Sequence, residues 1–315
     1  MQQDKVFAGK TIACFTLGES LSHPAHAATG LCVGYGCCAE THQDQDFATV
    51  FNAMLADPLS AQIDTLVIGS WGNEYQQSAD EVVALLVAQH AALPQLQHLF
   101  IGNISQEENE ISWIEQGNLS PLYDTYPQLR TLKIRGGNRL TFGSLQLAHL
   151  QTLIVETGGL DNAILTEIAA ASLPELTHLE LWLGDEGYGN NCTETDVQAL
   201  LDALAAGNFP KLQRLGLRNS DNADAVAAVV AASPAVQQLH VLDLSLGALT
   251  DVGAQALLES PHLQSLQSLD LHYHYLSDAM MAQLQTLPLA VDVSEQQEPD
   301  DWGDDELYRP VFVSE

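Results

Sequence analysis

The sequence predicts an α/β fold in which short parallel strands alternate with helices in a repeating stack. A pattern with aliphatic residues at its first, fourth and sixth positions recurs eight times between residues 63 and 271. The two-residue alternation inside each match indicates a strand with one buried face. Most matches are followed by apolar residues at helical spacing. One strand–helix unit cannot bury its own apolar face, so the units are expected to form a solenoid. Its curved parallel sheet would lie on the concave face, with the helices on the convex face.

The expected strands follow the repeat in order along the chain. They centre on Leu66, Leu99, Leu132, Leu153, Leu179, Leu215, Leu242 and Leu269, with a weaker ninth match at Val291. The segment 31–36 is expected to form a further strand before the first match. Residues 308–313 are expected to form a last strand, which Pro310 restricts to a sheet edge.

The expected helices occupy the intervals between these strands. They are predicted over 46–55, 161–171, 193–205, 223–232, 250–258 and 277–287. Thr250 and Ser277 are suitable N-cap residues. Ser78 precedes Glu81 by three residues, which is the spacing of a capping box.

The repeat also predicts how the chain is divided. Residues 1–60 are expected to cap the N-terminal end with a strand and a helix, residues 61–295 to form the solenoid, and residues 296–315 to form an acidic capping tail. The longer segment 102–122, which contains Trp113, is expected either to cover the stack or to form a lid at the concave rim.

Charge excludes some classes of partner. The chain has 41 acidic and only 10 basic residues, for a net charge of −31. Such a field repels nucleic acids and anionic membranes, so neither is expected as a partner. The sequence contains no apolar run long enough to span a membrane. The first 30 residues do not fit a secretory signal, so a cytoplasmic location is expected.

Cysteine and histidine residues near the N-terminus give a weak metal signal. Cys32, Cys37 and Cys38 lie close in sequence to three histidines, His23, His26 and His42. They lack the paired spacing of structural zinc sites. We therefore expect reduced thiols and no metal.

Two resemblances follow from these motifs. The stretch LDLSLGALTDVGAQAL, residues 242–257, resembles the leucine-rich repeats of the ribonuclease-inhibitor type. The blocks LVIGSWG (66–72), LELWLG (179–184) and LDLSLG (242–247), with the ending FVSE, resemble a family of bacterial cytoplasmic leucine-rich-repeat proteins that has no assigned activity. The resemblance implies the fold and the compartment, and supplies no catalytic residue.

The candidate binding residues lie between or just beside the strand aliphatics, where side chains point into the concave groove. They are Lys133, Arg135, Glu180, Trp182, Arg214, Arg218, Asp243, Asp270, His272 and Asp292. Four of the ten basic residues fall on this face, and Trp182 is an aromatic residue suited to binding. These ten residues are the predicted partner-binding site.

Three of the carboxylates should form a ladder across neighbouring strands. At a spacing near 5 Å, Asp243, Asp270 and Asp292 repel one another by about 3 kcal/mol per pair at an effective dielectric of about 20. Proton uptake, pairing of Asp243 with Arg214 and Arg218, a bound cation, or a partner's basic group could each relieve the repulsion. The sequence leaves these four alternatives open.

The predicted function is a non-enzymatic scaffold that binds a protein or peptide on the concave face. The common nucleotide-binding, hydrolase and metalloprotease motifs are absent, and no cofactor is expected. The alternative is a small-molecule or metal-dependent activity centred on Asp243, Asp270 and His272. The sequence does not predict an oligomeric state.

Overall fold

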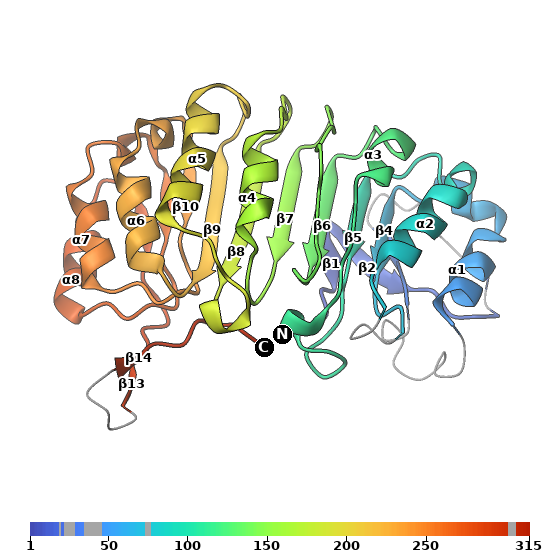
Figure 1. Ribbon diagram of the computed structural model, residues 1–315, viewed down its shortest axis with the longest axis horizontal. Coiled ribbons are helices and arrows are strands. Elements are labelled where there is room, and N and C mark those ends of the chain that lie inside the picture. Colours follow the sequence, from blue (N-terminus) through green and yellow to red (C-terminus); the bar gives the residue numbers. More distant parts are fainter. Residues whose placement is uncertain (19, 22–28, 35–45, 73–76, 302–306) are drawn as a thin grey trace. The chain divides into compact units, whose positions relative to one another are not determined.

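The computed structural model describes residues 1–18, 20–21, 29–34, 46–72, 77–301 and 307–315. The chain divides into two compact units, residues 1–156 with Glu315 and residues 157–314. Each unit is a largely parallel β-sheet with helices on one face (Figure 1). The predicted boundaries near residues 60 and 295 remain predictions.

The strands of the first unit follow chain order, from β1 to β7. They are β1 Val6–Phe7, β2 Lys10–Cys14, β3 Thr29–Val33, β4 Thr65–Ile68, β5 His98–Ile101, β6 Thr131–Arg135 and β7 Thr152–Glu156. Strands β1 and β2 pair antiparallel, and all later neighbours pair parallel.

The second unit continues the same pattern from β8 to β12. Its strands are β8 His178–Gly184, β9 Arg214–Ser220, β10 Val241–Asp243, β11 Ser268–Asp270 and β12 Ala290–Asp292, and β13 Asp300–Asp301 pairs with β14 Leu307–Tyr308 as a separate ribbon. Tyr308 is thus in a strand, but the predicted strand does not continue to residue 313.

Leucines at the fourth repeat position set the register in both units. Leu66, Leu99, Leu132 and Leu153 are direct partners across the first sheet, and Leu179, Leu215, Leu242, Leu269 and Val291 are direct partners across the second. Each of these leucines is at most 1% exposed. The repeated strand–helix unit in this register is a leucine-rich-repeat solenoid.

The helices are short and lie against the sheets. They are α1 Phe47–Leu55, α2 Asp80–Ala88, α3 Pro121–Thr125, α4 Asn162–Ala169, α5 Glu194–Ala205, α6 Ala223–Ala232, α7 Asp251–Glu259 and α8 Asp278–Leu284. Short 3₁₀ turns occupy Pro58–Gln62, His90–Ala92, Ile111–Trp113, Glu186–Tyr188, Pro234–Gln238 and Leu263–Ser265. Helices of this length are marginal alone, so packing must stabilise them. In Figure 1, α4 to α8 lie side by side along the second unit, where successive helices contact one another.

Aspartates at helix starts link one repeat to the next. Asp224 accepts hydrogen bonds from Thr250 N at 2.8 Å and Thr250 Oγ1 at 2.6 Å. Asp251, one repeat later, accepts from Ser277 N at 2.8 Å and Ser277 Oγ at 2.7 Å. The predicted N-caps at Thr250 and Ser277 are confirmed, because each side chain accepts from its own helix.

Three local expectations need correction. Helix α2 begins after Ala79, and Ser78 Oγ donates to the side chain of Asp80, so the predicted capping box is not formed. Cys32 is disulfide-bonded, whereas a reduced thiol was expected. The expected strand over 31–36 is β3, which ends at Val33. Residues 35 and 36, together with His23, His26, Cys37, Cys38 and His42, lie outside the described residues.

Phe7 of β1, a strand that the sequence did not reveal, covers part of the first sheet. Phe7 packs with Cys32, Val67 and Phe100 in a buried cluster on the sheet face that was expected to be open. The ring centroids of Phe7 and Phe100 are 5.6 Å apart. Residues 1–7 therefore close this part of the predicted groove.

Candidate binding face

The ten predicted binding residues fall into two groups, one on each unit. Lys133 and Arg135 lie on β6 of the first unit, and the other eight belong to the second unit. Within each unit they alternate along the strands with the leucines that form the core. Their exposure, however, differs widely, and it decides which of them a partner could reach.

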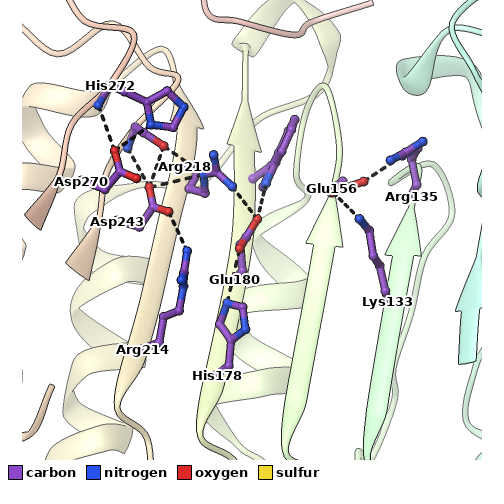
Figure 2. Close-up of polar contacts among 12 residues, drawn as sticks. Lys133, Arg135, Glu156, His178, Glu180, Arg214, Arg218, Asp243, Asp270 and His272 are labelled. Carbon is purple, nitrogen blue, oxygen red and sulfur yellow. Dashed lines mark hydrogen bonds and ion pairs between the residues drawn. The ribbon is translucent and has the colours of Figure 1, made fainter. Parts of the chain in front are cut away.

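Lys133 and Arg135 are held in a four-residue ion cluster. The Nζ of Lys133 lies 2.6 Å from Asp4 Oδ2 and 2.7 Å from Glu156 Oε1. Arg135 places Nη2 2.7 Å from Asp4 Oδ1 and Nε 2.8 Å from Glu156 Oε2. Figure 2 shows Glu156 between the two cations. The side chains of Lys133 and Arg135 are only 8% and 2% exposed.

The cluster has no net charge, because its two cations are matched by two carboxylates. Burial would lower the pKa of Arg135, but the Glu156 and Asp4 carboxylates raise it. For Asp4, burial acts to raise the pKa, and Lys133 and Arg135 outweigh it and hold the pKa below its usual range. The aromatic face of Phe100 lies 4.7 Å from Lys133 Nζ. While Asp4 is in place, neither cation is accessible to a partner.

Glu180 is the centre of a second cluster, on the second unit. Its Oε1 accepts from Arg218 Nη1 at 2.8 Å and from Trp182 Nε1 at 2.9 Å. His178 Nε2 lies 3.3 Å from Glu180 Oε2, in poorer hydrogen-bond alignment. Burial would raise the pKa of Glu180, but His178, Arg218 and Trp182 together hold it well below its usual range.

Asp243 completes this cluster from the neighbouring strand. Its carboxylate lies 3.3 Å from Arg218 Nε and 3.4 Å from Arg214 Nη2, and it accepts a 2.6 Å hydrogen bond from Ser245 Oγ. Of the four alternatives for the carboxylate ladder, internal pairing with the two arginines is therefore present at Asp243. Gly216 helps to make room, because a Cβ there would lie 3.2 Å from Glu180 Cγ.

The rest of the ladder is arranged as the register predicts. Asp270 pairs directly with Asp243 on one side and with Asp292 on the other. His272 Nδ1 lies 2.7 Å from Asp270 Oδ1. Possible ligand atoms of Asp270, His272 and Asp292 all lie within 4.8 Å of one another. Hydrogen bonds from Ser294 lower the pKa of Asp292.

The residues that remain accessible on the second sheet define what we call the exposed face: His178, Arg214, Asp270, His272 and Asp292. The Arg214 side chain is 43% exposed, although its Nε is buried and has no hydrogen-bond partner among the described residues. The side chains of Asp270 and His272 are 27% and 23% exposed. Trp182, in contrast, is buried at 6% exposure and stacks against Arg218, so it is not available as an anchor.

Four residues of the two clusters were not among the predicted site residues. Glu156, His178 and Ser245 occupy groove positions of the repeat, so the repeat pattern could have placed them on the same face as the predicted residues. Asp4 gave none, because it precedes the first match and its contact with Lys133 spans 129 residues.

A separate acidic pocket lies beyond the strand ends of the second unit. Its volume is about 720 Å³, and its lining includes Asp185, Glu186, Asp221, Asp224, Tyr308 and Arg309. Burial raises the pKa of Asp221. Asp221 and Asp224 nevertheless accept hydrogen bonds from backbone amides of the adjacent loops, so they already have structural roles.

Comparison with known proteins identifies the family. No protein-family model and no curated protein matches the chain. A Bacteroides fragilis protein, whose crystal structure was solved by a structural genomics consortium, aligns with a TM-score of 0.74 and 32% identity, over 84% of this chain and 72% of that chain. The chain belongs to the family of this Bacteroides fragilis protein. Membership in the family of this protein implies the fold and assigns no activity.

Two further solved structures are more distant. An internalin from Listeria monocytogenes aligns with a TM-score of 0.33 and 15% identity, over 85% of this chain and 79% of that chain. The APL1 leucine-rich repeat domain aligns with a TM-score of 0.25 and 12% identity, over 90% of this chain and 84% of that chain. Because both TM-scores are low, neither structure supports an inference about a property of this chain. Among the described residues, no helix has the length and apolar character needed to cross a membrane.

Proposed function

We propose that the chain is a non-enzymatic scaffold that binds a segment of another protein on the exposed face of its second unit. The observation that carries this proposal is Arg214. Its side chain is 43% exposed, and the contact of its Nη2 with Asp243 is long at 3.4 Å. A guanidinium whose terminal nitrogens are weakly engaged is suited to bind a carboxylate in two-point geometry.

The charges of the exposed face are mixed and are distributed over three strands of one sheet. Arg214 starts β9, while Asp270 and Asp292 end β11 and β12. Neighbouring strands are about 4.8 Å apart, so these charges extend over a distance that suits a peptide segment better than a small molecule. A partner with a carboxylate for Arg214 and a basic group for Asp270 and Asp292 would complement the surface.

The buried clusters support binding over catalysis. A general acid or base works best with a pKa near the operating pH. Glu180 has a lowered pKa and is fully engaged by Arg218 and Trp182, so it stays ionised at neutral pH. Its cluster is therefore built as a stable ion-pair network. The net charge of −31 further disfavours nucleic acids and anionic membranes as partners.

Site-specific crosslinking tests the proposal. A photo-crosslinking amino acid replaces Ser268, which is half-buried on β11, and in the control it replaces Val252, which is 75% exposed on helix α7. We expect a discrete protein adduct from position 268 and none from position 252, and we expect Arg214→Glu to abolish the adduct. Equal labelling at both positions, or an adduct unaffected by Arg214→Glu, would contradict the proposal.

A divalent cation at Asp270, His272 and Asp292 is the second candidate. The sequence-based alternative used Asp243, but the arginines neutralise that carboxylate and Asp292 takes its place. Carboxylate and imidazole ligands suit zinc or manganese. Titration calorimetry with each ion tests it, with Asp292→Asn expected to weaken binding at least tenfold. No heat of binding for the unmodified protein would remove this candidate.

The compartment and the repeat subtype also belong to the proposal. A spacing of 27 residues between the Leu242 and Leu269 centres and the strand–helix alternation support a ribonuclease-inhibitor-like subtype. The sequence supports a cytoplasmic location, whereas disulfides such as that of Cys32 persist mainly in oxidising compartments. Counting free thiols in protein isolated under alkylating conditions decides between the two.

A further inference from the structure

The first four residues are bound by the first unit in the way that a protein binds a separate peptide. Asn103 pairs with both backbone groups of Asp4: its Oδ1 accepts from Asp4 N at 2.7 Å, and its Nδ2 donates to Asp4 O at 3.1 Å. Arg135 Nη1 donates to Gln2 O at 3.1 Å. The backbone N of Gln106 donates to Met1 O at 2.9 Å. These hydrogen bonds bind the backbone of an extended segment, so they do not depend on which side chains the segment carries.

Two side chains of this segment are bound in addition, and the first is Gln3, whose Nε2 donates to Glu108 Oε2 at 2.9 Å. Asp4 places one carboxylate oxygen 2.6 Å from Lys133 Nζ and the other 2.7 Å from Arg135 Nη2. Among the described residues, Glu156 is the other anion paired with the two cations. Without Asp4, two buried cations would share a single carboxylate, and an uncompensated buried charge is strongly destabilising. The site therefore requires an anionic group at this position.

Little apolar burial holds the segment in place. Gln2 and Lys5 are exposed, and Met1, Gln3 and Asp4 are half-buried. Val6, the next residue along the chain, is 60% exposed. Polar contacts that protein, peptide and water can all make are more readily exchanged than a buried apolar core.

We propose that the sheet face around Lys133, Arg135 and Asn103 is a recognition site for an extended peptide segment that carries one aspartate, and that residues 1–4 occupy it in cis. The occupant in trans is a segment of another protein with the same chemistry. A second copy of this chain is disfavoured, because each copy carries a net charge of −31. This site is on the first unit and does not depend on the exposed face of the second.

The tethered segment hides the site in the unmodified protein. A segment joined by a short connection competes at an effective concentration in the millimolar range. A free peptide must therefore exceed that concentration to displace it. Weakening the segment should reveal the binding, whereas the unmodified protein should bind the same peptide weakly.

The experiment uses the full chain and a peptide of residues 1–5, labelled with fluorescein on its lysine, because Lys5 is exposed. Fluorescence anisotropy is measured with the unmodified protein, with Asp4→Asn and Asp4→Lys, and with Asp161→Asn, which alters an aspartate cap on helix α4 of the second unit. A second peptide has asparagine in place of its aspartate. We expect Asp4→Asn and Asp4→Lys to bind the aspartate peptide at least tenfold tighter than the unmodified protein or Asp161→Asn does. We expect the asparagine peptide to bind at least tenfold more weakly.

The proposal is wrong if the two Asp4 variants keep the unmodified circular dichroism spectrum and still unfold cooperatively, at whatever temperature, yet bind neither peptide. It is also wrong if they bind both peptides equally. If these variants do not fold, hydrogen exchange of the unmodified protein decides. We expect the amides of Asp4 and Gln106 to exchange at least tenfold faster than the β6 amides. Equal protection would make the segment a permanent part of the core and overturn the proposal.

Discussion

Replacing Glu180 with glutamine should destabilise the second unit strongly. The substitution keeps the shape of the side chain and removes the charge that accepts from Arg218 and Trp182 at 2.8 and 2.9 Å. Removing one partner of a buried ion pair typically costs about 3–5 kcal/mol. Asp243 remains 3.3 Å from Arg218 and keeps part of the compensation. We therefore expect about 3 kcal/mol, the low end of that range.

For a unit of this size, about 3 kcal/mol corresponds to a fall in melting temperature of about 6–12 °C. The matched control is Glu175→Gln, because Glu175 pairs with Lys211 at 2.7 Å but both side chains are about half exposed, at 40% and 54%. Exposed pairs contribute about 0–1 kcal/mol. The control should therefore shift the melting temperature by no more than about 2–4 °C.

Differential scanning calorimetry measures both shifts, and a double-mutant cycle with Arg218→Met isolates the pair. We expect a coupling free energy of about 2 kcal/mol, since residues in one ion-pair network are not additive. The reasoning is refuted if Glu180→Gln melts within 2 °C of Glu175→Gln (about half the smallest difference expected). Strict additivity in the cycle would refute it equally.

Three further outcomes follow from the structure. The folded-state pKa of Asp4 is lowered from its ordinary value of 3.8, so its contribution to stability is present above that value and is lost as the pH falls through the folded pKa. Urea unfolding between about pH 5 and pH 2 should therefore show a flatter pH dependence in Asp4→Asn than in the unmodified protein. Gly184→Ala should cost about 3 kcal/mol in the same assay, because φ is +83° and the new Cβ would lie 2.0 Å from a backbone oxygen. Gly207→Ala, at φ +87° with no atom within 4 Å, should cost only about 1–2 kcal/mol, and equal costs would exclude the steric cause. Leu242→Ala should cost about 2–5 kcal/mol, whereas Val252→Ala, 75% exposed, should stay within about 0.5 kcal/mol, and a small effect at Leu242 would contradict its place in the core.

The parts of the fold that the sequence predicted well are those with strong local periodicity. Helix α6 spans the predicted residues 223–232, and α5 differs from its prediction by one residue. The expected helix over 46–55 is α1, with Asp46 as its N-cap. Such segments combine an apolar face with caps, so their local and tertiary preferences agree.

The parts that the sequence missed lack that periodicity. Strands β1 and β2 pair in a short antiparallel hairpin outside the repeat. The segment 310–313 is held without being a strand, because Asn219 pairs with Val313 through both its amide atoms. Segment 102–122 was expected to cover the stack or to form a lid, and within it Asn103 and Gln106 bind residues 1–4. In each case, residues far apart in the chain make the deciding contacts.

The sequence by itself determined the strand register and the identity of the residues that alternate with the leucines. A leucine at a fixed place in every repeat can be buried only if the strands align, and this alignment fixes which side chains share the opposite face. The tertiary structure alone decided which of those side chains stay in contact with water. That outcome depends on Asp4 and Phe7, which lie before the repeat and bury Lys133, Arg135 and Phe100. Desolvation turned cations that the pattern placed in an open groove into members of closed ion pairs.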